Sequence, residues 1–102
     1  MKIEEVSYGQ VSVQTLCRAF LSLRDEKECL QFLEDIMTVR EIQDLTQRLS
    51  VASLLKEGKG YSQIAEEISV SSATISRVNR ALNFGAGGYQ TVLKRLKQTK
   101  EA

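Results

Sequence analysis

The apolar residues of this chain recur every three or four positions, which is the spacing of amphipathic helices. Two such stripes predict helices over about residues 11–23 and 26–37. Asp25 followed by Glu28 forms a capping box at the start of the second helix. The two stripes consist of Val13, Leu16, Cys17, Phe20 and Leu23, and of Cys29, Phe32, Leu33 and Ile36.

A third and longer helix is predicted over residues 39–57, where Thr38 and Glu41 repeat the capping-box pattern. Its apolar residues cover a wider arc than one face requires, so we expect this helix to be central and packed from several sides. Gly58-Lys59-Gly60 then ends it. The apolar positions are Ile42, Leu45, Leu49, Val51, Ala52, Leu54 and Leu55.

Residues 61–80, YSQIAEEISVSSATISRVNR, have the spacing of a helix-turn-helix. We expect Ala65 where the second helix crosses the first, Val70 as the apolar centre of the turn, and Ser71 as the N-cap that follows. Ser69 stands where many such motifs have a left-handed Gly, so modest strain is expected there. The inward positions are Ile64 and Ile68 in the first helix, and Ile75, Val78 and Leu82 in the second.

The outer face of the second helix has a composition suited to duplex DNA. Small residues let the backbone approach base edges, hydroxyls donate or accept hydrogen bonds, and Arg binds guanine or phosphate. We expect Arg77 and Arg80 to divide between base and phosphate. An ordinary amphipathic hairpin with a polar surface is the alternative. The residues predicted to contact DNA are Ser71, Ser72, Ala73, Thr74, Ser76, Arg77 and Arg80.

The net charge of +1 is unevenly distributed along the chain. Residues 1–58 hold seven basic and ten acidic side chains, whereas residues 59–102 hold seven basic and three acidic ones. Because phosphate attraction supplies most non-specific DNA affinity, this asymmetry indicates a DNA-binding half joined to an assembly half. A merely solvated basic face is the alternative.

The fold class predicted from these patterns is all-α, as a single domain over residues 1–102. The chain has no Pro and no alternating run longer than Val11-Ser12-Val13. The Gly-rich stretch 84–88 is expected to be a hinge or helix stop before a short last helix over residues 88–97. A chain of 102 residues buries a limited core, which favours pairing with a second copy.

Several function classes are not expected from the composition. With no His, and with Cys17 and Cys29 both expected in the core, neither a metal site nor an enzyme is indicated, and no cofactor is expected. No segment approaches the roughly 20 apolar residues of a membrane helix. The acidic N-terminus lacks an apolar signal core, so we expect a cytoplasmic protein without a membrane partner.

The order of these elements resembles the tryptophan repressor family, in particular its YerC/YecD-type branch. The segments FLEDIMTVREIQDLTQRLSVASLLKEG and SSATISRVNRAL carry the resemblance, which covers about residues 32–82. It implies an intertwined six-helix homodimer. Its dimerisation helices would span residues 11–58. The helix-turn-helix would span residues 61–83, and a C-terminal helix would span residues 88–97.

The resemblance also implies an effector pocket between the central and recognition helices, where two arginines and threonine hydroxyls hold an amino-acid corepressor. However, Val78 stands where the tryptophan-binding members have Gly, and Ala81 where they have Ser. A β-branched side chain there would fill the space of an indole ring, so a response to tryptophan is not expected. The matching pocket residues are Thr38, Arg48, Thr74 and Arg77.

Arg48 has two interpretations. In the first, its guanidinium group binds a small carboxylate ligand other than tryptophan in the pocket. In the second, it forms an ion pair with Glu41 or Asp44 on its own helix, which is the commoner arrangement for such an Arg.

The function predicted from the sequence is a sequence-specific DNA-binding transcriptional regulator of the repressor type. As a homodimer, it would place two recognition helices in successive major grooves of double-stranded DNA, about 34 Å apart. The alternative is a protein-interaction module of the transcription machinery that uses the same hairpin without reading DNA. The low total charge and the few basic residues on the reading face support that alternative.

Overall fold

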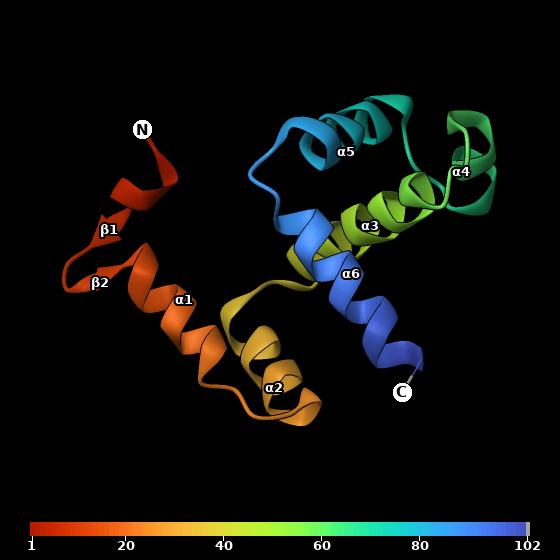
Figure 1. Cartoon of the computed structure of the whole chain (residues 1–102). Helices are drawn as coiled ribbons and strands as arrows, with labels where there is room; N and C mark the ends of the chain where they lie inside the picture. Colours follow the sequence, from red (N-terminus) through yellow and green to blue (C-terminus); the bar gives the residue numbers. More distant parts are fainter. Residues whose placement is uncertain (102) are drawn as a thin grey trace. The chain divides into compact units, whose positions relative to one another are not determined.

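The computed structural model describes residues 1–101, and Figure 1 shows its elements in chain order. The chain is mostly helical and divides into two compact units, Met1–Val39 and a second that begins at Arg40. The elements of the first unit are the 3-10 turn η1 (Ile3–Glu5), strands β1 (Ser7–Tyr8) and β2 (Val11–Ser12), and helices α1 (Val13–Leu21) and α2 (Glu26–Ile36). Four helices follow, namely α3 (Val39–Lys56), α4 (Tyr61–Glu67), α5 (Ser72–Phe84) and α6 (Gly88–Glu101).

The six helices agree with the predicted all-α class, but a short antiparallel hairpin that was not predicted lies between η1 and α1. The strands have two residues each and turn at Gly9, whose φ of 59° lies in the left-handed region. Strands this short leave almost no alternating pattern to detect. The first helix therefore begins at Val13 instead of Val11, and the Ser12 hydroxyl accepts a hydrogen bond from the Thr15 amide at 3.2 Å.

The two helices of this unit meet through an aromatic pair. The ring centroids of Phe20 and Phe32 are 5.1 Å apart, in an edge-to-face arrangement at 72°. The expected cap of α2 is confirmed, because the Asp25 carboxylate accepts a hydrogen bond from the Glu28 amide at 2.9 Å. The Glu28 carboxylate accepts a hydrogen bond from the Arg24 amide at 2.9 Å. In the usual capping box this carboxylate accepts instead from the amide of the N-cap residue, which here is Asp25.

No residue of the first unit is buried, although both of its helices have an apolar face. Cys17 is exposed and Cys29 is half-buried, so their assignment to the core is wrong for the single chain. The physical reason is that two short helices alone do not enclose a side chain of either stripe.

The second unit packs around α3, as its wide apolar arc predicted. Its core joins α3 to α4 and α5, and Tyr89 and Leu93 of α6 pack against it as half-buried residues. The buried residues are Val51 and Ala52 of α3, Ile64 of α4, and Ile75, Val78 and Leu82 of α5.

The end of α3 is a glycine stop, as expected. Gly58 has a φ of 92°, and its amide donates to the Leu55 carbonyl at 3.0 Å. The Lys59 amide donates to the Leu54 carbonyl at 3.1 Å, which completes a Schellman motif. The last helix, α6, runs to Glu101 and is longer than the predicted range of 88–97. Within the described residues, no helix combines the length and the apolar character needed to cross a bilayer.

Candidate nucleic-acid interface

Helices α4 and α5, with the turn between them, form the predicted helix-turn-helix in Figure 1. The prediction that Ser71 caps the second helix is confirmed, since its hydroxyl accepts a hydrogen bond from the Thr74 amide at 3.2 Å. Val70, the expected centre of the turn, is half-buried and packs against the core, as does Ile68. The hairpin is therefore anchored from inside by its turn as well as by its helices.

The inner face of the hairpin differs from the prediction at one position. Ile64, Ile75 and Val78 are buried, with exposed fractions of 0%, 0% and 3%. Ala65, however, is exposed, so its assignment to the helix crossing is wrong. Adjacent residues on a helix lie about 100° apart, and with Ile64 directed into the core Ala65 is turned away from it.

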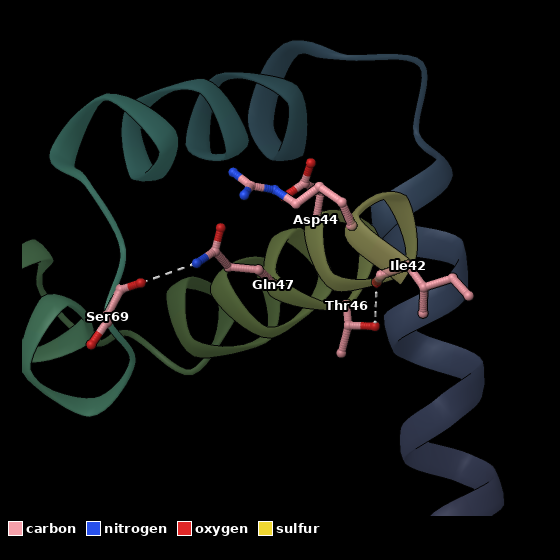
Figure 2. Close-up of polar contacts among 6 residues, drawn as sticks. Ile42, Asp44, Thr46, Gln47 and Ser69 are labelled. Carbon is pink, nitrogen blue, oxygen red and sulfur yellow. Dashed lines mark hydrogen bonds and ion pairs between the residues drawn. The ribbon is translucent and has the colours of Figure 1, made fainter. Parts of the chain in front are cut away.

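The turn before α5 contains no left-handed residue. The only positive φ angles among the described residues are at glycines, so the strain expected at Ser69 is absent. A contact from α3 holds this turn instead. Figure 2 shows the side-chain amide of Gln47 donating to the Ser69 carbonyl, at 3.1 Å.

An ion pair joins the segment just before α4 to the last residue of that helix. The Lys59 ammonium donates to the Glu67 carboxylate at 2.7 Å. This hydrogen bond raises the pKa of Lys59 above its ordinary value of 10.5, and the negative charges of Glu67 and Glu57 act in the same direction.

The predicted DNA-contacting residues lie along the first turns of α5 and immediately before it. Six of the seven are exposed, and Thr74 is half-buried. The two arginines, Arg77 and Arg80, are both exposed, and no acidic residue occurs anywhere from Ser69 to Lys100. The exposed residues are Ser71, Ser72, Ala73, Ser76, Arg77 and Arg80. This set, together with Thr74, is called the reading face below.

A cavity of about 450 Å³ lies between α3, α5 and the start of α6 and is called the arginine pocket. It brings together Arg48, Thr74 and Arg77, three of the four predicted effector residues. Thr38 belongs to the first unit and is not among the residues that line the pocket. The full lining is Arg40, Asp44, Gln47, Arg48, Thr74, Arg77, Val78, Ala81 and Tyr89.

The carboxylate of Asp44, one of the two partners considered for Arg48, is bound by another residue. The Arg40 Nε donates to it at 3.1 Å, one helical turn away. Val78 borders the pocket, yet its side chain is 97% removed from solvent as part of the core. The pocket is therefore rich in guanidinium groups and has a β-branched residue in its wall.

Four residues of this pocket were not predicted to line it, namely Arg40, Asp44, Gln47 and Tyr89. The spacing of Arg40, Asp44, Gln47 and Arg48 places them on one face of α3, and that periodicity was a usable signal. Tyr89 had no such signal, because it reaches the pocket after the Gly-rich segment that joins α5 to α6.

Comparison with known proteins gives consistent results. The Trp repressor protein family matches residues 11–97 of this chain. YerC of Bacillus subtilis (strain 168) is 48% identical over 85 residues, which is 83% of this chain and 82% of YerC.

Two solved structures are also similar. A TrpR-like protein from Eubacterium eligens ATCC 27750 has a TM-score of 0.79 and 49% identity, over 83% of this chain and 88% of that one. A proposed Trp repressor from Staphylococcus aureus has a TM-score of 0.79 and 45% identity, over 83% and 85% of the two chains. The family match covers both helices of the hairpin and the residues of the arginine pocket. The chain therefore belongs to the Trp repressor family, whose members are regulators and not enzymes.

Proposed function

We propose that this protein is a sequence-specific DNA-binding transcriptional regulator of the repressor type, acting in the cytoplasm as a homodimer. The observation that carries the proposal is the reading face itself. Six of its seven residues are exposed and none is acidic, and the helix that carries it has its opposite side buried in the core. A helix of this kind enters a major groove with its N-terminal residues at the base edges.

The dimer proposal rests on what a single chain leaves uncovered. No residue of the first unit is buried, and Leu21 and Leu30 have exposed fractions of 82% and 55%. An apolar groove of about 1200 Å³, called the α3/α6 groove, lies on the second unit. Its apolar lining residues are Leu49, Leu54, Leu93 and Leu96. Both surfaces need a partner to remove them from water.

Charge favours the first unit of a second copy as the occupant of this groove. Lys56, Lys94 and Lys97 line the groove, with Glu57 as its acidic residue. Residues 1–39 carry four basic and seven acidic side chains, so their helices have the opposite sign. Complementary charge of this kind fixes register between partners. The dimerisation region would then span residues 11–58, and the two copies would present their reading faces to a palindromic site.

Binding to duplex DNA tests the proposal directly. The protein is titrated against random duplex at about 50 mM salt and then at rising salt, where a log-log slope of several units per dimer is expected. Selection of bound sites from a random pool should return a palindrome. Absence of binding at the lowest salt contradicts the proposal.

We propose further that the arginine pocket holds a small anionic effector and not tryptophan. The support is its guanidinium-rich lining, with Arg40, Arg48 and Arg77 against one carboxylate, Asp44. Thermal melting of the protein with a panel of small carboxylates and phosphates tests this, because a ligand that binds only the folded state raises Tm.

A protein-interaction module is the second candidate function. Phe84, the last residue of α5, has an exposed fraction of 87% and is a large apolar side chain without cover in the single chain. Aromatic residues are enriched in protein interfaces. This candidate requires that the dimer fails to bind DNA while Phe84→Ala abolishes its association with a protein partner.

A further inference from the structure

We infer that Gln47 and Gln90 are positioning residues that set the orientation of α5 for DNA recognition. The inference rests on the proposed function for its consequence, but the contacts that carry it are independent of DNA. Neither glutamine belongs to the reading face. Each ties one end of the α5 segment to another helix of the second unit.

The first tether acts just upstream of α5. Gln47 lies near the middle of α3 and donates from Nε2 to the Ser69 carbonyl at 3.1 Å, across 22 residues of sequence (Figure 2). Ser69 lies outside both helices, two residues before the N-cap Ser71. A shift of α5 relative to α3 therefore breaks this hydrogen bond, since its length and angle tolerate little change.

The second tether acts at the other end of α5. Gln90 of α6 donates from Nε2 to the Leu82 carbonyl at 3.0 Å, in a part-buried position. The last four carbonyls of a helix have no partner within it, and Gln90 satisfies one of them. The Gln90 carbonyl oxygen accepts a hydrogen bond from the ammonium of Lys56, the last residue of α3. This end of α5 is thereby connected to α3 as well.

The two tethers lie on either side of the apolar contact between the helices. Gln47 and Lys56 are nine residues apart on α3, which corresponds to about 13.5 Å along its axis. Between them lie Val51 and Ala52, which form one core with Ile75 and Val78 of α5. Apolar packing resists separation of the helices but is non-directional, whereas hydrogen bonds at both ends resist rotation and sliding.

The consequence is a recognition helix whose direction is set by the protein's own side chains. Base readout requires the α5 side chains to meet base edges at hydrogen-bond distance, so a rotated helix loses specific contacts. Phosphate contacts from flexible Arg side chains tolerate the same rotation, because they carry no sequence information. Loss of a tether should therefore lower specificity and leave non-specific affinity in place.

The experiment uses Gln47→Met and Gln90→Met, which remove the amide and keep an unbranched side chain with good helix propensity. Gln43→Met is the matched control, since Gln43 is exposed on the same helix as Gln47. Affinity is measured on a duplex selected by the wild-type protein and on random duplex. Each tether variant should bind the selected duplex about tenfold more weakly, with random-duplex affinity and salt slope unchanged.

A second measurement needs no DNA. Residual dipolar couplings of the ¹⁵N-labelled protein report the angle between α3 and α5, which should change in both tether variants and not in Gln43→Met. Failure of the wild type to bind any duplex would overturn the proposed function, and the couplings would still test the tethers. Unchanged couplings and unchanged discrimination in both variants would overturn the inference. Equal loss on both duplexes with a lowered Tm would also overturn it, because that pattern indicates a general structural role.

Discussion

The amide of Gly85 donates a hydrogen bond to the Ala81 carbonyl at 3.0 Å, and the same oxygen occupies the space that a β-carbon on residue 85 would need. Gly85 ends α5 with φ −86° and ψ −156°, so the requirement for glycine here is steric and does not come from a left-handed backbone. Any side chain at this position must displace the backbone at the end of the recognition helix.

Gly85→Ala should therefore destabilise the protein by about 1–3 kcal/mol, which is the usual cost of forcing an extra methyl into occupied space. Urea denaturation followed by circular dichroism measures the change. Gly88→Ala is the matched control, because nothing lies within 4 Å of a β-carbon there and Gly88 begins α6. That control should be neutral or stabilising, since Ala favours helix over Gly. Equal effects of the two substitutions would contradict the steric account.

Alanine substitution of Arg77 and of Arg80 should show whether each arginine contacts a base or a phosphate. If Arg77 reads a base, Arg77→Ala costs about 1–3 kcal/mol on the selected duplex and relaxes specificity at one position. An arginine that binds phosphate instead loses affinity equally on all sequences and lowers the salt slope by about one. Anisotropy titrations of Arg77→Ala and Arg80→Ala on selected and random duplexes measure both quantities. Lys2→Ala is the control and should change neither, because Lys2 is exposed and lies outside the proposed dimerisation region.

Leu96 should be essential for dimerisation. It lines the α3/α6 groove with an exposed fraction of 49% in the single chain. Leu96→Asp places a carboxylate in that groove, and a desolvation penalty of several kcal/mol weakens the dimer about a hundredfold or more. Light scattering after size exclusion should give twice the 11.4 kDa chain mass for the wild type and for Thr91→Asp, an exposed control on the same helix. A monomeric wild type would contradict the dimer.

Val78 should exclude an indole ring from the arginine pocket, so tryptophan should leave the Tm of the wild-type protein unchanged. Val78→Ala should destabilise the protein by about 2 kcal/mol through lost burial, while the same substitution at the exposed Val92 should have little effect. Thermal melting with and without tryptophan measures both. A clear rise in the wild-type Tm with tryptophan would show that Val78 does not block the pocket.

The ion pair between Lys59 and Glu67 makes a pH-dependent contribution. The pKa of Lys59 is raised in the folded state, so the stabilisation is fully present below the unfolded pKa of about 10.5 and is lost as pH rises through the higher folded value. Lys59→Met should lower Tm slightly from neutral pH up to about 10.5, and this difference should disappear only as the pH rises through the folded pKa of Lys59, which is higher. Salt should reduce it as well. Lys27→Met, on α2, is the control. A Tm difference that persists at high pH would point to lost packing of the Lys59 stem.

The hairpin was the best-predicted part of the fold, because short-range spacing determines it. Ile64, Ile75, Val78 and Leu82 are buried as their periodicity required, and Ser71 caps α5 as its chemistry required. Contacts between distant parts of the chain gave no such signal. The hydrogen bond from Gln47 to Ser69 joins residues 22 positions apart and depends on how α3 lies against the turn.

Other predictions differed from the structure for two reasons. Some sequence patterns were too short to detect, and some apolar faces are not covered within a single chain. The two-residue strands before α1 are below the length at which alternation is visible. The apolar stripe that includes Cys17 was predicted correctly as a stripe, but an amphipathic pattern shows that a face is apolar and not which chain covers it. The lining of the arginine pocket was only partly predictable, since Tyr89 reaches it from another helix.

The turn between α4 and α5 has a consequence for recognising such hairpins in other proteins. It connects the two helices without a positive φ angle, and an α3 side chain holds it through a main-chain oxygen. Position 69 is therefore open to variation. Searches that demand a glycine at this turn would overlook hairpins built in the same way, whereas a donor side chain on the preceding long helix would help to find them.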